Sequence, residues 1–312
     1  MVQRTINLKT LQMKNYKILL FTFLIAPLFS FSQEQAKDSI VDKPERDAFE
    51  SSTLVDNQTN IVFQKNTLEI MMQHRFDYLN RDNSLLGIYG SANIRIGASY
   101  SILDWLNVGY GITKTNITSD FSVKAALLRQ TRSGRIPVSV TYYGNMAIDG
   151  RSVDLKEPLP QPNVDAGYFV LKQDRYSYFH QLIIAKRFNS DLSLQIAPSL
   201  THFNAVNYGY ENDRFSIAFG GRYKISPQTS IIFDYTQPIT KLDNPDYPNK
   251  SLNNAGFSLG AEFSTSGHAF QIFIANYKGI LPQYNTMKNS NDFFDGTSGM
   301  LIGFNITRRY NF

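Results

Sequence analysis

The sequence predicts an all-β protein: a transmembrane antiparallel up-and-down β-barrel of about 12 strands, an even number as single-chain bacterial barrels have, over residues 67–312. Three observations predict this fold. A succession of segments alternates apolar and polar residues, as strands do when their side chains point alternately to lipid and lumen. Short and long connectors alternate between these segments, and the chain ends on Phe312 inside the last of them.

The N-terminal residues predict export. Lys14 and Lys17 precede an apolar run over residues 18–29, and residues 30–32 (Ser-Phe-Ser) form a small-x-small cleavage site. This order of basic, apolar and small residues is typical of a secretory signal peptide. We therefore expect residues 1–32 to be removed from the mature chain.

Met13 is favoured as the true start of translation, because the basic residues of the leader follow it closely.

The segment between the leader and the first strand has a different composition. Residues 33–66 are rich in charged residues, Ser, Asn and Gln, with Pro44 and few large apolar residues. Such composition rarely supports a packed core. It predicts a periplasmic N-terminal extension that is mostly flexible.

Charge and cysteine content exclude several classes of function. The leader holds four of the 31 basic residues and no acidic residue, which leaves 27 basic against 26 acidic residues, a net charge of +1. Binding to nucleic acid is therefore not favoured, because it requires a basic stripe on the surface of the folded domain. The absence of cysteine excludes disulfides, thiolate nucleophiles and cysteine metal sites.

The alternating segments begin at Thr67 and no helical period of comparable length competes with them. The expected strands are 67–78, 91–102, 105–115, 120–131, 136–148, 175–188, 191–206, 213–225, 228–238, 254–265, 268–280 and 299–312. Pro198 lies inside one of them and cannot donate a hydrogen bond to a neighbouring strand. It predicts a bulge or a misplaced boundary in that segment.

The connectors between the strands come in two lengths. Tight turns are expected at 103–104, 132–135, 189–190, 226–227 and 266–267, and longer connectors at 79–90, 149–174, 239–253 and 281–298, with 116–119 and 207–212 intermediate. Outer-membrane barrels have short periplasmic turns and long extracellular loops. A soluble β-sandwich, the alternative interpretation of the strands, has no reason to keep this alternation.

The last strand carries a further signal. Ile302, Phe304 and Ile306 fall on one face together with Tyr310 and Phe312, and polar or small residues fall on the other. Barrels place aromatic residues at the membrane interface. We expect Tyr310 and Phe312 to lie there and to act as the assembly signal, because a terminal aromatic resembles the signal that the barrel-assembly machinery reads.

The same alternation places charged residues of both signs toward the lumen. The candidate lumen charges are Glu69, Arg75, Asp77, Arg95, Lys124, Arg222, Asp234, Glu262 and Arg309. They could pair across strands and fill the interior, or they could line a narrow polar channel that selects solutes. Strand number does not decide, because about eight strands leave a filled interior and about sixteen an open channel.

Enzymatic signals are weak. None of the four histidines lies at a metal-ligand spacing from another, and Asp77, close to His74, falls on the opposite strand face. A barrel phospholipase would need a His with a nearby Ser on the outer face, and no His has one. The carboxylates of the 149–174 loop match no calcium-binding pattern. We expect no catalytic residue, no metal and no cofactor.

Four segments resemble an uncharacterised family of predicted outer-membrane barrels from Bacteroidota: residues 68–76 (LEIMMQHRF), 86–89 (LGIY), 93–97 (NIRIG) and 104–111 (DWLNVGYG). The resemblance is most specific over residues 54–115 and looser toward the C-terminus. Asp77 departs from it, because Gly is expected after the His-Arg-Phe run. The family has no settled activity, so the resemblance implies the fold and the location and transfers no site residue.

The sequence thus predicts a barrel in the cell outer membrane, in contact with lipid and with the barrel-assembly machinery during insertion. The favoured function is a passive channel or porin-like transporter for small solutes. The alternative is a non-conducting structural or docking barrel with a salt-bridged lumen. A membrane-embedded lipid hydrolase is a distant third.

Overall fold

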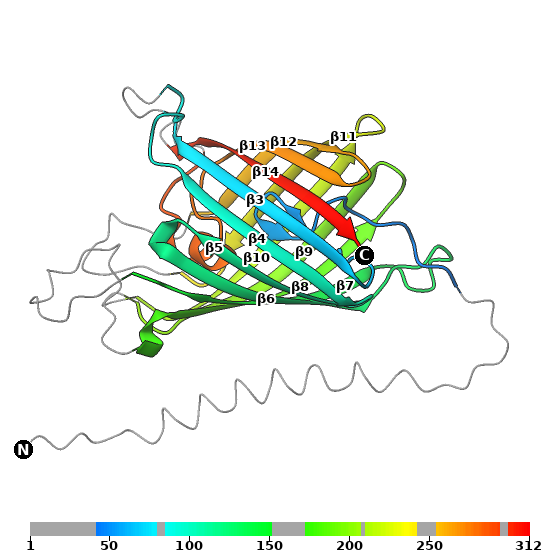
Figure 1. Cartoon of the computed structure of the whole chain (residues 1–312), viewed down its shortest axis with the longest axis horizontal. Helices are drawn as coiled ribbons and strands as arrows, with labels where there is room; N and C mark the ends of the chain where they lie inside the picture. Colours follow the sequence, from blue (N-terminus) through cyan, green and yellow to red (C-terminus); the bar gives the residue numbers. More distant parts are fainter. Residues whose placement is uncertain (1–41, 80–84, 152–171, 207–209, 242–253, 294–298) are drawn as a thin grey trace, which may run out of the picture. The chain divides into compact units, whose positions relative to one another are not determined.

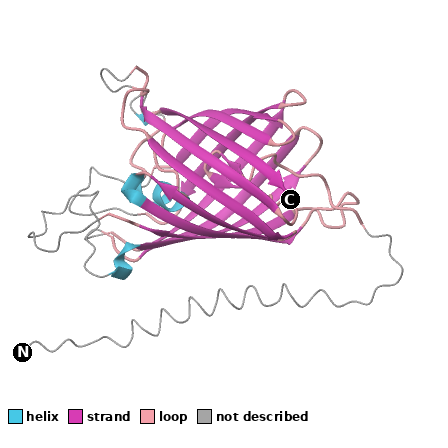
Figure 2. Ribbon diagram, viewed as in Figure 1, coloured by secondary structure: helices cyan, strands magenta, loops and turns pink. Residues whose placement is uncertain are grey.

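The computed structural model describes residues 42–79, 85–151, 172–206, 210–241, 254–293 and 299–312. Within these residues, twelve antiparallel strands, β3 to β14, form a closed barrel in which every strand pairs with its neighbours in the sequence (Figure 1). The barrel wall is strand nearly throughout, as Figure 2 shows. The predicted fold class is confirmed, and the leader at residues 1–32 lies outside the described residues.

The strands lie where the alternating pattern predicts them and differ mainly at their ends. They are β3 Thr67–Tyr78, β4 Asn93–Leu103, β5 Leu106–Thr113, β6 Thr118–Leu128, β7 Ser139–Ile148, β8 Tyr176–Arg187, β9 Leu192–Phe203, β10 Asp213–Lys224, β11 Thr229–Pro238, β12 Gly256–Ser264, β13 His268–Ala275 and β14 Leu301–Asn311. Short helices η2 (Thr115–Ile117), η3 (Lys172–Arg175) and α2 (Pro282–Lys288) lie between strands. No helix in the described ranges is long and apolar enough to cross a membrane.

The last strand closes the barrel on the first. β14 pairs antiparallel with β3, with Arg309 opposite Glu69 and Phe304 opposite His74. The pairing shifts register once, between Leu301 and Gly303. Closure satisfies the hydrogen bonds that an edge strand would leave open, which is the condition for a sheet in lipid.

Burial alternates along the strands with a period of two. In β3, Glu69 and Met71 are buried, whereas Ile70 between them is 40% exposed. In β12, Leu259 is 43% exposed and Glu262 is buried. Large apolar side chains therefore cover the outer face and polar ones fill the inner face, as a barrel surrounded by lipid requires.

Pro198 lies inside β9 without the bulge or misplaced boundary that we expected. It stands opposite Ile217 of β10 in an unbroken register. On the other side, the pairing with β8 skips Ala197 and Pro198 and resumes in the same register at Ile196. The strand thus tolerates the lost donor, because the fixed φ of proline fits an extended chain.

The N-terminal region differs from what its composition suggested. We expected residues 33–66 to form a mostly flexible periplasmic extension; residues 43–66 pack against the barrel and largely inside it. It contains two short paired strands, β1 (Thr53–Leu54) and β2 (Asn57–Gln58), drawn in blue within the barrel in Figure 1. Polar residues can leave water here because the lumen offers hydrogen-bond partners on every side.

Candidate functional site: the plugged lumen

Residues 48–63, which we call the plug, occupy the lumen. The middle of the plug is a hairpin of β1 and β2 that turns at Val55, whose φ of 56° is left-handed. Inside the hairpin, the Asp56 amide donates to the Leu54 carbonyl at 2.7 Å, and Thr59 Oγ1 donates to the Ser51 carbonyl at 2.7 Å. A lone two-stranded hairpin is marginally stable in water. The barrel wall must therefore hold it.

Asp234 of β11 holds the turn of the hairpin. Its Oδ2 accepts from the amides of Asn57 at 2.9 Å and Asp56 at 3.3 Å, and its Oδ1 accepts from Asn57 Nδ2 at 2.7 Å. Asp234 is 2% exposed. A buried carboxylate is costly unless hydrogen bonds satisfy it. The plug supplies three such bonds, so the seating of the plug and the burial of this charge depend on each other.

Side chains of β13, β14 and β3 bind the hairpin backbone. The Val55 carbonyl accepts from Arg75 Nη2 at 3.2 Å and from Asn305 Nδ2 at 2.7 Å. Gln271 donates to the Thr53 carbonyl at 2.9 Å and accepts from the Val55 amide at 3.3 Å. These contacts replace the neighbouring strands that a hairpin in a sheet would have.

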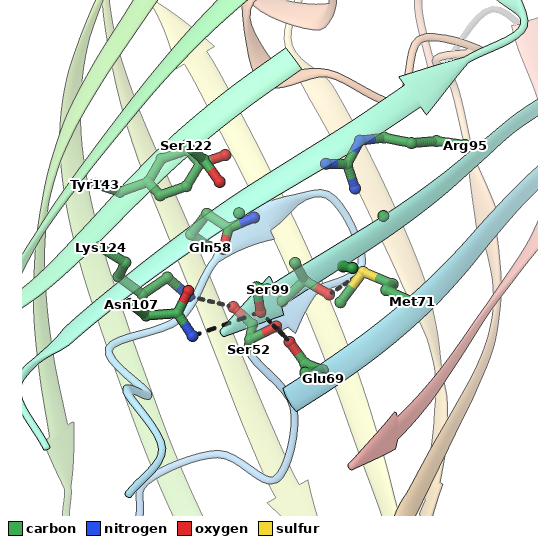
Figure 3. Close-up of a pocket in the computed structure, with 14 residues that line it drawn as sticks. Ser52, Gln58, Glu69, Met71, Arg95, Ser99, Asn107, Ser122, Lys124 and Tyr143 are labelled. Atoms are coloured by element: carbon green, nitrogen blue, oxygen red, sulfur yellow. Dashed lines mark hydrogen bonds between the residues drawn. The ribbon is translucent and has the colours of Figure 1, made fainter. Parts of the chain in front are cut away.

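A third group of contacts lies against β3 to β6 (Figure 3). Lys124 Nζ donates to the Ser52 carbonyl at 2.9 Å, and Ser52 Oγ donates to Glu69. A cavity of about 50 Å³ remains between the plug and this wall, where Gly97 and Gly109 leave space. A cavity of roughly 10–15 Å³ in this measure is enough for one water. This gap can hold water, and it is too small for a solute.

Apolar packing adds to the polar contacts. Phe49 and Leu54 of the plug belong to one buried cluster with Ile232 and Phe273 of the wall. Gly220 of β10 provides room for Leu54, since a Cβ at Gly220 would lie 2.5 Å from Leu54 Cδ2. Shape-matched burial of this kind stabilises one position of the plug over others.

The segment between β13 and β14 also folds into the lumen, at the end opposite to the C-terminus (Figure 1). Gln283 of α2 donates to Asn145 of β7 at 2.7 Å. Asn285 of α2 donates to Asp56 of the plug. The loop at this end therefore contacts the plug directly, and both elements fill the barrel interior.

Ion pairs join strands on the inner face. Arg95 of β4 lies 2.7 Å from Asp120 of β6, and Arg222 of β10 lies 3.1 Å from Glu262 of β12. Arg222 also contacts Glu50 of the plug at 3.2 Å. Such pairs do not favour folding strongly by themselves, but removal of one partner leaves a buried charge.

The structure places the candidate lumen charges in three settings. Those that bind the plug are Glu69, Arg75, Lys124 and Asp234, and those paired within the wall are Arg95, Glu262 and Arg222, the last of which also contacts the plug. Asp77 is buried at the long-loop end, 2.8 Å from Lys278. Arg309 lies at the other end, where its guanidinium is 5.1 Å from the Phe63 ring and Nη2 donates to Ser266.

Several residues of the site are absent from the sequence-based set. Asp120 and Arg214 share the strand parity of Lys124 and Arg222, so their inward direction was available from the pattern, and both are buried. Gln271 and Asn305 are neutral, and nothing in their local sequence marks them as contacts of the plug.

Groups outside the membrane-spanning strands have shifted pKa values. Burial raises the pKa of Asp47, which precedes the plug. Burial also raises the pKa of Tyr277 and of Tyr284, which lie in the segment that contains α2. Both phenols therefore keep their proton at neutral pH and can donate hydrogen bonds.

Two histidines contact polar side chains of neighbouring strands. His180 Nδ1 lies 2.7 Å from the Tyr142 hydroxyl, and His202 Nδ1 lies 2.7 Å from Asp213. Across the described ranges, no group of three His, Asp or Glu side chains is arranged to hold a metal ion.

Two aromatic residues, Tyr310 and Phe312, lie at the C-terminal end of the chain. Tyr310 stands opposite Leu68, with the Arg308 guanidinium 4.8 Å from its ring. Phe312 is 80% exposed, and its amide donates to the Asn66 carbonyl at 3.1 Å. Their function as an assembly signal stays a prediction.

A closed antiparallel barrel with an apolar exterior and a polar interior defines the class: a transmembrane β-barrel, the form in which proteins span the bacterial outer membrane. The chain belongs to the family described as membrane bound beta barrel domain (DUF5777), whose model matches residues 49–310. That range includes nearly the whole plug. The predicted outer-membrane location is confirmed.

Known structures show similar barrels at low sequence identity. The chain is similar to the NanC porin (8% identity, 78% of this chain and 100% of that one, TM-score 0.47). It is also similar to the KdgM porin (6% identity, 79% and 99%, TM-score 0.43) and to an outer membrane channel from Pseudomonas putida F1 (10% identity, 80% and 97%, TM-score 0.44). No curated protein matches the sequence. At these similarities no function is transferred.

Proposed function

We propose that the protein is a porin-like outer-membrane barrel without catalytic activity, whose plug closes the lumen at rest and must shift before a small solute can pass. The observation that carries the proposal is the set of contacts by which the wall holds the plug. Asp234 of β11, Gln271 of β13 and Lys124 of β6 all bind it. The cavity between the plug and strands β3 to β6 is about 50 Å³.

The plug is continuous with the chain at the short-turn end. There the Glu45 amide donates to the Gln130 carbonyl at 2.8 Å, and the Arg132 amide donates to the Lys43 carbonyl at 3.0 Å. Short turns face the periplasm in outer-membrane barrels. A plug attached at that end can shift toward the periplasm without leaving the chain, which gives opening a direction.

The contacts between the plug and the wall also support a second candidate function. In it, the barrel never conducts and serves as a structural or docking component. The two candidates differ in the effect of losing contacts between plug and wall. In a gated porin, weakening of the plug contacts opens a path through a polar interior that carries Arg95 and Glu262. In a docking barrel, the same change lowers stability and opens nothing.

Liposome swelling separates the two. Purified full-length protein and the variant Asp234→Ala are reconstituted and exposed to iso-osmotic sugars of increasing size. The proposal predicts slow swelling with the wild type and faster swelling with Asp234→Ala for small sugars only. Equal rates for the two proteins, with both shown to be assembled by heat-modifiable mobility, would refute the gated porin and leave the docking barrel.

A further inference from the structure

A second cavity lies at the long-loop end of the lumen and shares a wall with the cavity beside the plug. Its volume is about 310 Å³, and the buried residues Asn93 of β4 and Thr113 of β5 line it. Four residues farther along the same two strands, Gly97 and Gly109 line the cavity of about 50 Å³. A strand rises about 3.3 Å per residue, so about 13 Å of one wall separates the two cavities.

An ion pair lies between the two cavities. Arg95 stands between Asn93 and Gly97 on the inner face of β4. Its Nε and Nη2 donate to Asp120 of β6 at 2.9 and 2.7 Å, and its Nη1 donates to Gln73 of β3 at 3.1 Å. The guanidinium therefore extends along the wall across β3 to β6. Anything that moves along this wall from one cavity to the other must pass the pair.

Neighbouring side chains hold the pair in one position. Asp120 Oδ2 also accepts from Asn145 Nδ2 of β7 at 3.1 Å, and Asn145 Oδ1 accepts from Gln283 Nε2 of α2 at 2.7 Å. Gly97 leaves room for the guanidinium, since a Cβ at Gly97 would lie 2.6 Å from Arg95 Nη1. Charged groups fixed in this way can select among solutes that pass close to them.

The wall on the plug side of the pair carries small polar side chains, among them Ser99 of β4 and Ser122 of β6. In Figure 3, Arg95 and Ser122 lie toward one end of this cavity and Glu69 lies toward the other. Glu69 is 3% exposed, and its Oε1 has no hydrogen-bond partner among the described residues. A buried carboxylate oxygen needs a donor, which water in the cavity can supply. This wall is therefore the hydrated side of the seated plug.

From this arrangement we infer that solutes move along the inner face of β4, β5 and β6, and that the pair of Arg95 and Asp120 is the constriction that determines charge selectivity on this route. The route rests on the proposed function, because the plug must shift before the smaller cavity widens. The pair has one charge of each sign, so the intact constriction favours neither anions nor cations.

Reversal potentials in planar bilayers test the constriction. In the Asp234→Ala background and a KCl gradient, Arg95→Gln leaves the Asp120 carboxylate and should raise the permeability of K⁺ relative to Cl⁻ about fivefold, the effect of one charge at about 4 Å in water. Asp120→Asn leaves the guanidinium and should lower the ratio by a similar factor. Arg222→Gln is the matched control, a buried arginine of another ion pair that lines neither cavity, and should leave the ratio unchanged. Shifts of the same sign, no shifts, or an equal shift in Arg222→Gln overturn the inference.

Thiol accessibility tests the route without requiring conductance. The chain has no cysteine, so Ser122→Cys and Ser258→Cys each provide one thiol for Ag⁺, and the thiol left unreacted is counted after unfolding. Ser258 lies on the inner face of β12, is 0% exposed and lines neither cavity. Ser122→Cys should react at least about tenfold faster, because a thiol away from a hydrated cavity reacts only after local opening.

Removal of both charges, by Arg95→Ala together with Asp120→Ala, should accelerate the reaction of Ser122→Cys further, with heat-modifiable mobility as the check on assembly. Equal rates for the two thiols overturn the route, and an unchanged rate after removal of the pair overturns the constriction. Absence of conductance in wild type and in Asp234→Ala alike refutes the proposed function, and the thiol rates then still decide which wall is hydrated.

Discussion

Replacement of Asp234 by Ala should release the plug while the barrel remains assembled. The carboxylate accepts bonds of 2.7 and 2.9 Å from Asn57 and a longer one from Asp56. A hydrogen bond to a charged group contributes about 1.5–3 kcal/mol, so the two short bonds amount to about 3–6 kcal/mol. Relief from burying the carboxylate offsets part of this. If the net loss is near the lower bound of about 3 kcal/mol, the fraction of molecules with an unseated plug rises about 100-fold.

The assay uses a single thiol in the plug. The chain has no cysteine, and Ser51 is 2% exposed, so Ser51→Cys provides a unique and nearly isosteric thiol that reagents reach only when the plug leaves its site. The rate of maleimide labelling in reconstituted barrels should rise about 100-fold when Asp234→Ala is added. An unchanged rate would refute the reasoning, because it would mean that Asp234 does not hold the plug.

Asp120→Ala is the matched control. Asp120 is also a buried carboxylate with three hydrogen bonds, from Arg95 Nε, Arg95 Nη2 and Asn145, all within the barrel wall. Its loss strands the Arg95 charge and should lower the unfolding temperature of the barrel. It should leave the labelling of Ser51→Cys near the wild-type rate. Equal acceleration by both changes would indicate general loosening.

The barrel and its inner charges support three further predictions. Replacement of Arg222 by Glu places like charges beside Glu262 and should cost on the order of 3–5 kcal/mol, measured as a lower unfolding temperature; an unchanged temperature would show that the pair is not buried in the membrane-embedded barrel. Deletion of Phe312 should reduce heat-modifiable barrel and leave exported precursor in the periplasm, and normal assembly would exclude it as the signal. A protease site inserted at residues 160–165 should be cut on intact cells, whereas one at residues 266–267 should survive; the reverse pattern would invert the topology.

The strands were predictable because their signal is local. The pleat of a strand and the contrast between lipid and lumen impose a period-two alternation. Each segment can therefore be recognised as a strand from its own residues. β3 was expected at residues 67–78 and spans Thr67–Tyr78. The pairing of β14 with β3 also followed from the sequence, because a barrel in lipid must close.

The plug was not predictable by the same reasoning. Its Ser, Thr, Asn and Gln residues have the composition of a solvated linker. The burial of the plug depends on partners of its backbone such as Gln271 and Asn305, which lie more than 200 residues from Val55. Local composition cannot distinguish water from a polar lumen as the partner. Phe49, Leu54 and Ile61 were the available signal, since a flexible extension has no need for them.

The central claim is that the seated plug closes the barrel, and single-channel recording with a reversible tether tests it most directly. Thr53 Oγ1 of the plug lies 3.7 Å from Met71 Sδ of β3, so Thr53→Cys and Met71→Cys can be joined by a short thiol cross-linker in the Asp234→Ala background. The account predicts steady conductance after a reductant has cleaved the tether, and no conductance while the tether is intact. Steady conductance through barrels with the tether in place would contradict it, because solutes would then pass beside a seated plug.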